Sequence, residues 1–510
     1  MFKSKKKLSP IVTFILLTVI VIVLSGFLSL LKIQAEYTTV SKVTNELVNN
    51  VVEVKNLFSL SGIKHIFTTA VSSFINYEPL PILIIVLIGI GVLEKSGFLE
   101  AFFTILTKNT KKNTVTFILI FISLLFSLLG NIGFVVMLPI GALLFKYGRR
   151  NPQGGVIATF ASLAFGSSIN IFMTATDSSL LTYTLKAAHL IDANYKIGTF
   201  FALFIMIVML IITSIIFTAI TEKKIMPKLP RIEYEEKEFV ITNRHLRGII
   251  VGLGLGLVYS LIIIYMIIPG LPLSGALLDT TASKYIDMVF GAKSLFNQGF
   301  VFIVTVLFAI IGFGYGFMAK TIRHSKEVSE SLAYSLDGVG YILVLMFFSS
   351  LFVNVYQESN IGEVLTAFAS TIIGSLNITG TMLIVISLIV ITIANVFCTN
   401  TIVKWSIISG SMVPLFMNAS ISPEFAQIVY SAGDAITNGI TPLFIYFVIF
   451  IAILEKYNKS ENVVTVFGSA RLILPYGIYI AIIWLVVIIG WYMIGLPIGI
   501  GSFPSVMFGG

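Results

Sequence analysis

Apolar stretches of about twenty residues or more, separated by short polar or basic segments, follow one another along most of this chain. A helix needs about 20 apolar residues to cross the hydrocarbon core of a bilayer. The pattern therefore predicts an all-α polytopic membrane protein with about nine transmembrane helices. We expect these helices at 11–31, 80–99, 154–182, 197–220, 248–269, 299–319, 338–356, 424–454 and 471–495.

Two further apolar segments, 115–147 and 381–417, are interrupted near the middle by Gly130-Asn131 and Thr399-Asn400. Each segment is too long for one spanning helix, and its two arms are short for two full crossings. Basic residues flank 115–147 on both sides, which places both of its ends on the same side of the membrane. We interpret both segments as re-entrant helical hairpins, with a pair of short full crossings as the open alternative.

Polar interruptions in the first half of the chain recur in the second half at a nearly constant offset. The offset is 263 residues from Ser96 to Ser359, 269 from Asn131 to Asn400 and 267 from Gly166 to Gly433. The last pair breaks the expected helices 154–182 and 424–454. Matching interruptions in two membrane-embedded halves are typical of secondary transporters with internal repeats, and they point to the binding site.

The distribution of basic residues predicts the topology, because cytoplasmic segments are enriched in lysine and arginine. Four lysines within the first seven residues precede the first apolar stretch, which we interpret as a retained helix with a cytoplasmic N-terminus. The basic loop 221–247 is expected on the same side. When the chain is traced from this loop, corresponding helices of the two halves cross the membrane in opposite directions. The prediction is an inverted-topology repeat in the cytoplasmic (plasma) membrane.

These boundaries divide the chain into five parts. We expect an N-terminal helix with an extracytoplasmic segment at 1–79, a first inverted repeat at 80–220, a connector with two linking helices at 221–319, a second inverted repeat at 320–495, and a C-terminal tail at 496–510.

Composition excludes several classes of protein. Hydrophobic residues make up 57% of the chain and charged residues 11%, whereas soluble domains average about 25% charged. Because much of the net charge of +9 lies in short loops, it reports topology and gives no reason to expect nucleic acid. The four histidines lack metal-ligand spacing, and no catalytic triad or phosphate-binding loop is present. We expect no enzyme activity, no cofactor, a lipid environment and a small-molecule substrate.

The interruptions can bind ions. Backbone N–H and C=O groups left unpaired at membrane depth are tolerated only inside protein or beside a cavity, where free carbonyls and side-chain oxygens can ligate sodium. An intramembrane carboxylate could instead carry a proton. Sodium or a proton is therefore the expected coupling ion, and no other metal is expected. The ion-coupling candidates are Asn131, Gly166, Ser168, Asn170, Asn400 and Asp434.

Two aspartates, Asp177 and Asp434, lie within otherwise apolar segments. A carboxylate at membrane depth is costly and indicates a functional site, although a helix end or a helix cap would also explain them. Trp405 follows the second hairpin tip. It could stack on an aromatic substrate, or it could serve packing or interfacial anchoring.

Several motifs resemble the p-aminobenzoyl-glutamate transporter (AbgT) family over nearly the whole chain. The first hairpin carries Gly130-Asn131-Ile132-Gly133-Phe134 and Gly148-Arg149-Arg150-Asn151-Pro152, and the next helix carries Thr176-Asp177-Ser178-Ser179. Later motifs are Lys404-Trp405, Gly433-Asp434, Asn438, Ile440-Thr441-Pro442-Leu443 and Pro475-Tyr476.

This resemblance implies a homodimeric inner-membrane protein that moves p-aminobenzoyl-glutamate, or exports sulfonamide-like antimetabolites, by means of an ion gradient. The family's site positions fall here on Asp177, Asn395, Trp405 and Asp434. Combined with the helix breaks, they give the following substrate-binding candidates: Asp177, Asn395, Asn400, Thr401, Trp405, Asp434 and Asn438.

Three positions depart from the family pattern. Ser431 stands where an arginine is usual, Ile402 where a serine is frequent, and Asn131 where many members have an aspartate. An arginine would bind a substrate carboxylate in a bidentate contact, so Ser431 makes the glutamyl substrate less certain than the fold. A dicarboxylate or short-chain organic-acid transporter of the same architecture is the alternative. An ion channel or an intramembrane enzyme would be a different class of protein.

Overall fold

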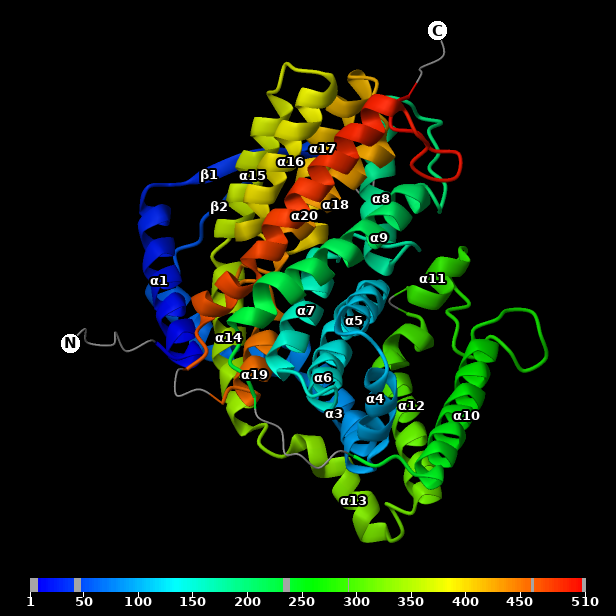
Figure 1. The fold of residues 1–510 in the computed structure, drawn as a ribbon. Helices are drawn as coiled ribbons and strands as arrows, with labels where there is room; N and C mark the ends of the chain where they lie inside the picture. The colour runs from blue at the N-terminus through cyan, green and yellow to red at the C-terminus, as the bar shows by residue number, and fades with distance from the viewer. Residues whose placement is uncertain (1–7, 41–46, 233–238, 292, 460–462, 507–510) are drawn as a thin grey trace.

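The computed structural model describes the chain except for residues 1–7, 41–46, 233–238, 292, 460–462 and 507–510 (Figure 1). The N-terminal lysines and the acidic stretch of the connector therefore lie outside the described residues, as do the side chains of Leu47 and Asn131. Elsewhere the structure is almost entirely helical, with one two-stranded antiparallel sheet. The prediction of an all-α polytopic membrane protein is confirmed.

Seven α-helices follow one another in the first half of the protein and seven in the second half. The first set is α3 (Pro79–Lys95), α4 (Phe98–Lys108), α5 (Lys112–Phe126), α6 (Asn131–Tyr147), α7 (Pro152–Phe165), α8 (Ala175–Ala188) and α9 (Leu203–Ile220). The second set is α14 (Gly340–Glu358), α15 (Ile361–Gly374), α16 (Gly380–Phe397), α17 (Thr401–Asn418), α18 (Pro423–Asn438), α19 (Phe447–Lys456) and α20 (Val466–Ile494). The chain breaks between α5 and α6, α7 and α8, α16 and α17, and α18 and α19. The last break follows Asn438, so Gly433 and Asp434, which were expected to interrupt their helix, lie within α18.

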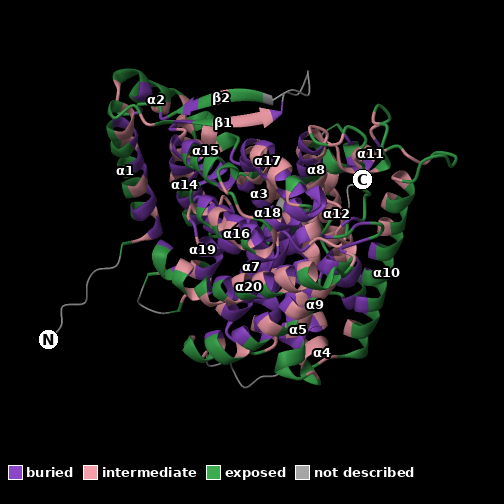
Figure 2. Cartoon of the chain, turned by 90° about the horizontal axis from the view of Figure 1, so that it is seen from above, coloured by how far each residue is buried: buried purple, intermediate pink, exposed green. Residues whose placement is uncertain are grey.

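The short helices α4 and α15 were not predicted separately, because their apolar residues continue the patterns of the neighbouring spans. The remaining helices are α10 (Asn243–Met266), α11 (Tyr285–Phe290), α12 (Leu295–Ala319) and α13 (Ser325–Ala333), which lie between the two sets. Helices α10 and α12 pack against each other, and α12 packs against α3. Figure 2 shows buried residues concentrated in central helices such as α7 and α18, whereas α10 at one edge is largely exposed.

The N-terminal region contains a β-hairpin that the sequence did not predict. Helix α1 (Pro10–Leu30) leads into β1 (Gln34–Val40) and β2 (Leu47–Glu53), and α2 (Leu60–Ile75) follows. Strand β1 packs on α15 and α17, whereas α1 and α2 pack on α14. The approach is close at Gly410 of α17, where a Cβ atom would lie 2.3 Å from the carbonyl oxygen of Thr38.

Within the described residues, nine helical segments are long and apolar enough to cross a membrane. This number equals the expected number of transmembrane helices, but two of the nine segments differ from the expected ones. The first arms of both hairpins, 112–129 and 380–397, satisfy the length criterion, whereas 154–182 and 424–454 are each divided into two short helices. The re-entrant course of the hairpins therefore stays a prediction.

Candidate functional site

The four interruptions converge on one cavity of about 400 Å³. Gly130 and Asn400 reach it from the two hairpin breaks, and Asp177 and Asp434 reach it from the two broken helices. Seven of the predicted site residues line the cavity, namely Ser168, Asn170, Asp177, Asn400, Thr401, Asp434 and Asn438. Residues as far apart in the sequence as Gly130 and Asn438 thus meet at one place, as the matching interruptions predict.

The break between α7 and α8 is organised around Asp177. Its Oδ2 accepts hydrogen bonds from Asn170 Nδ2 at 3.1 Å, from Thr174 Oγ1 at 2.7 Å and from the Thr174 amide at 3.0 Å. Thr174 caps α8 in return, since its Oγ1 accepts from the Asp177 amide at 3.1 Å. This reciprocal arrangement satisfies amides that a helix N-terminus leaves unpaired, and it holds a carboxylate at the cavity wall.

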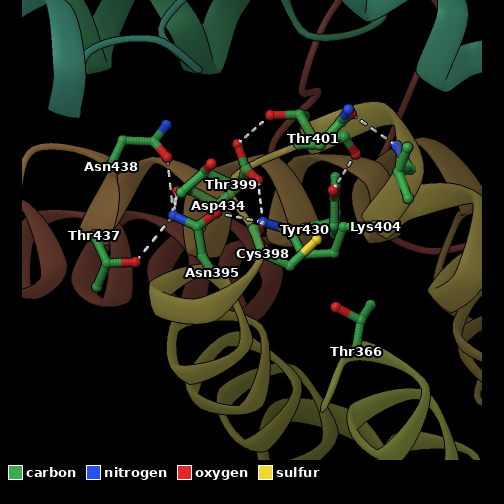
Figure 3. A network of polar contacts seen from close by, with 12 residues as sticks. Thr366, Asn395, Cys398, Thr399, Thr401, Lys404, Tyr430, Asp434, Thr437 and Asn438 are labelled. Carbon is green, nitrogen blue, oxygen red and sulfur yellow. Dashed lines mark hydrogen bonds and ion pairs between the residues drawn. The ribbon is translucent and has the colours of Figure 1, made fainter. Parts of the chain in front are cut away.

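The second broken helix places Asp434 in an ion pair with Lys404 (Figure 3). Asp434 Oδ1 lies 2.5 Å from Lys404 Nζ, and the side chains are 6% and 0% exposed. Asp434 Oδ2 accepts a hydrogen bond of 2.8 Å from Thr401 Oγ1 at the start of α17. A buried charge is costly unless it is paired and hydrogen-bonded, so this pair fixes the second hairpin against α18.

Asn395 lies behind the cavity and holds the same network together. Its Nδ2 donates to the Asp434 carbonyl, to Thr437 Oγ1 at 2.9 Å and to Asn438 Oδ1 at 2.9 Å. Its Oδ1 accepts from Lys404 Nζ. The side chain is fully buried and is not part of the cavity wall. Its position suits an organising contact between α16 and α18 better than direct contact with a substrate.

The two halves also touch each other directly at the cavity. Asn438 Nδ2 donates to Ser167 Oγ at 3.2 Å, which joins the two broken helices. On the other wall, Asn400 caps α17 by accepting from the Val403 amide at 3.1 Å. Asn400 thus both caps α17 and lines the cavity.

Trp405 is placed differently from a substrate-stacking residue. It is fully buried outside the cavity wall, with its ring centroid 4.3 Å from that of Tyr430. Its Nε1 donates to the Leu180 carbonyl at 3.1 Å and to Thr184 Oγ1 at 3.0 Å. The packing alternative considered above fits this arrangement, since Trp405 joins α17 to α8.

Gly166 also lies outside the cavity wall. A Cβ atom there would lie 2.2 Å from both Leu124 Cδ2 and the Ser162 carbonyl oxygen, so glycine allows close packing at the break. The side chain of Asn131 lies outside the described residues.

Sequence reasoning missed three contributors. Lys404 was noted beside the tryptophan but not assigned to the site, although a lysine in an apolar segment is itself a signal. Ser127, whose Oγ donates to Asn170 Oδ1 at 3.2 Å, and Gln357 both line the cavity. Neither residue stands out from the many serines and polar helix ends of the chain.

A second cavity, of about 390 Å³, adjoins the first. The two share Gln357, Thr399 and Asn400. The second is also lined by Lys55 and Glu358, which lie 3.7 Å apart (Nζ to Oε2) and are each more than a third exposed. The shared residues indicate that the site is reached from the side of the β-hairpin.

Comparisons with known proteins agree with this architecture. The model of the AbgT putative transporter family matches residues 5–506. The p-aminobenzoyl-glutamate transport protein of Escherichia coli (strain K12) is 24% identical over 497 residues, covering 97% of this chain and 94% of the relative.

Two solved structures are similar over nearly their whole length. MtrF of Neisseria gonorrhoeae, described as illuminating a class of antimetabolite efflux pumps, is 26% identical with a TM-score of 0.50, and the match covers 97% of both chains. The YdaH transporter of Alcanivorax borkumensis is 25% identical with a TM-score of 0.48, covering 96% of this chain and 100% of its own.

Proposed function

Because the chain belongs to the AbgT putative transporter family, we propose that it is a secondary transporter driven by a sodium or proton gradient. The proposed cargo is p-aminobenzoyl-glutamate or a related aromatic amide or antimetabolite, such as a sulfonamide. Transport takes place across the cytoplasmic membrane, with the N-terminus on the cytoplasmic side. A homodimer is the proposed assembly.

One observation carries the proposal: both hairpin breaks and both broken helices meet at a single cavity of about 400 Å³. Small-molecule sites fall within about 300–1,000 Å³, so the volume fits one small organic molecule. Broken helices and hairpin tips supply unpaired backbone groups for substrate and coupling ion, as in repeat-built transporters. The cavity is bounded by elements from both halves, which is what alternating access requires.

The lining suits an aromatic amide. Phe134, Phe444 and Tyr446 form an aromatic part of the wall, and Asn170 and Asn400 supply amide groups on the polar part. The names of the relatives support the same chemistry, since one is a p-aminobenzoyl-glutamate transport protein and another belongs to a class of antimetabolite efflux pumps.

The coupling ion is best accommodated near the break of α7. Ser168 is 8% exposed, and its Oγ has no hydrogen-bond partner among the described residues. It lines a small cavity of about 30 Å³ together with Asn170 and Asp177. An unpartnered hydroxyl oxygen together with carboxylate and amide oxygens around a space of this size suits a sodium ion, and the Asp177 carboxylate suits a proton.

The test is uptake of radiolabelled p-aminobenzoyl-glutamate into proteoliposomes with an inward sodium gradient, an inward proton gradient or neither. Asp177→Asn and Asn400→Ala are expected to lower uptake on the order of tenfold or more, because each removes a polar contact at the cavity. Asn377→Ala, at an exposed loop residue, is the matched control. Absence of saturable uptake by folded wild-type protein under every gradient would exclude this substrate.

The second candidate, transport of a dicarboxylate or short-chain organic acid, is kept because of one departure from the family pattern on the cavity wall. Ser431 lies on the cavity wall at the position where the family usually has an arginine. No lysine or arginine side chain is among the described residues that line this wall. The bidentate contact expected for the glutamyl end is therefore missing. Competition of labelled uptake by unlabelled sulfonamide or by unlabelled dicarboxylate distinguishes the two candidates.

A further inference from the structure

The ammonium group of Lys404 is surrounded by oxygen atoms, as a bound metal cation would be. Its Nζ contacts three oxygens of different kinds, which are Asp434 Oδ1 at 2.5 Å, the Cys398 carbonyl at 2.9 Å and Asn395 Oδ1. Nζ donates hydrogen bonds to the Asn395 and Cys398 oxygens, and it meets Asp434 Oδ1 as an ion pair rather than along an N–H direction. The side chain is fully buried, so its charge is balanced mainly by these protein oxygens.

The backbone around this position adds to its preference for a cation. Helix α16 ends at Phe397, and the carbonyl of Cys398 directly after it points toward Nζ (Figure 3). The C-terminal end of a helix carries partial negative charge. In transporters built from broken helices, such ends and unwound carbonyls coordinate the coupling sodium ion. Carboxylate, amide and carbonyl oxygens together form a ligand set for a hard cation.

The corresponding place in the first half has no such internal cation. The offset that relates Asn131 to Asn400 places Val135 opposite Lys404. Val135 is fully buried in α6 and carries no charge. At the break between α7 and α8, Ser168 Oγ has no hydrogen-bond partner among the described residues. Among the described residues, the second half thus supplies its own positive charge beside Asp434, whereas the carboxylate of the first half, Asp177, is held by hydrogen bonds from uncharged groups.

We propose that the Lys404 ammonium is a tethered cation that fills a sodium-type site in the second half, so that Asp434 is balanced without taking up a coupling ion. Exchangeable ions are then bound in the first half, near Ser168 and Asp177. This inference deepens the proposed function and rests on it for the role of the coupling ion, but the occupancy of the site by Lys404 can be tested without transport.

The experiment measures binding of ²²Na⁺ to purified full-length protein, together with the melting temperature in sodium chloride and in choline chloride. Lys404→Ala removes the ammonium and leaves Asp434, Asn395 and the Cys398 carbonyl in place. It is expected to bind one more sodium ion per chain than the wild type. Sodium should also raise its melting temperature by a few degrees more than it raises that of the wild type.

Two control variants separate a cation site from a merely structural ion pair. Lys404→Arg keeps the charge and should gain no sodium ion. Lys404→Ala combined with Asp434→Asn removes both charges and should lose the gained ion. If Lys404→Ala folds only in sodium, that dependence itself supports the proposal.

If Lys404→Ala does not fold in either salt, Lys404→Gln is measured instead, because it keeps a hydrogen-bond donor while removing the charge. The proposal is overturned if the neutral variants show neither added sodium binding nor sodium-dependent stabilisation, or if the gain persists without the Asp434 carboxylate. Absence of p-aminobenzoyl-glutamate transport by the wild type, together with the sodium gain in Lys404→Ala, would contradict the proposed substrate and leave the tethered cation standing.

Discussion

Ser96 and Ser359 make the same hydrogen bond at corresponding points of the two halves. Each hydroxyl accepts from the backbone amide two residues further along the chain, at 3.3 Å in both cases. Each serine also ends a helix and is followed by a residue with positive φ, which is Gly97 at 84° and Asn360 at 57°. The matching offset seen in the sequence therefore corresponds to matching local geometry, which supports the interpretation of the chain as two related halves.

The serine pair gives the first prediction. Ser96→Ala and Ser359→Ala should each lower the free energy of unfolding by about 1 kcal/mol, because each leaves a buried amide without its acceptor. Thermal unfolding of the purified protein measures the loss, and Ser375→Ala at an exposed position is the control. If only one of the two substitutions lowered the free energy of unfolding, the two serines would be equivalent in geometry but not in their contribution to stability.

The breaks could be predicted because they are visible as polar residues within apolar runs. A break leaves backbone N–H and C=O groups unpaired, and at membrane depth such groups are tolerated only inside protein or beside a cavity. The pairing of Lys404 with Asp434 could not be predicted, since the two residues lie on different helices and only their packing brings them together. The burial of Trp405 depends in the same way on α8.

The β-hairpin escaped prediction for a different reason. Its strands, Gln34–Val40 and Leu47–Glu53, mix β-branched and polar residues in short runs. Such runs also fit amphipathic segments at a membrane surface. We attribute their strand conformation to packing, because β1 lies on α15 and α17. That tertiary contact cannot be recognised from the sequence alone.

The second prediction concerns an ion pair between α3 and α6. Glu94 Oε1 lies 3.2 Å from Lys146 Nζ, with side chains 12% and 40% exposed. Because solvent screens a partly exposed pair, a double-mutant cycle of Glu94→Gln and Lys146→Met should give a coupling energy of about 0.5–1 kcal/mol. The coupling should fall when unfolding is measured in high salt. Salt-independent coupling would indicate a packing effect instead.

Trp405 gives the third prediction. Trp405→Phe keeps an aromatic ring against Tyr430 but removes the donor to the Leu180 carbonyl and Thr184. Stability should fall by about 1 kcal/mol, whereas KM for p-aminobenzoyl-glutamate should not change, because the side chain lies outside the cavity wall. Thermal unfolding and saturation of uptake measure the two effects. A raised KM with unchanged stability would return Trp405 to the role of a substrate contact.

The fourth prediction tests the side from which the site is reached. Gln357 is exposed and lines both adjoining cavities. In a background with Cys398→Ser, Gln357→Cys should react with a membrane-impermeant maleimide added outside the cell. Saturating substrate should slow the reaction several-fold by covering the cavity. Met137→Cys, fully buried in α6, is the unreactive control. Reaction only from the cytoplasmic side would reverse the topology.

The fifth prediction is a pH dependence outside the spanning helices. The backbone amides of Arg323 and His324 donate to the Glu327 carboxylate at the start of α13, which lowers the pKa of that carboxyl below 4.5. A carboxyl whose pKa is lowered in the folded state stabilises the fold at pH values above its ordinary pKa. That stabilisation is lost as the pH falls through the lowered pKa of the folded state. The protection factors of the α13 amides, which correct for the intrinsic pH dependence of exchange, should therefore fall at acidic pH. Glu327→Gln should exchange faster at neutral pH and show less of this dependence.

The β-hairpin has a mechanical consequence. Strand β1 is held to α17, where Thr39 Oγ1 donates to the Ser406 carbonyl at 2.9 Å, while α1 rests on α14. Only residues 31–33 join α1 to β1, and three residues span about 10 Å when fully extended. A displacement of α17 relative to α14 by more than about 10 Å would therefore require the β-hairpin to detach from α17 or α1 to detach from α14. The N-terminal region is therefore expected to restrain movement of the second hairpin relative to α14.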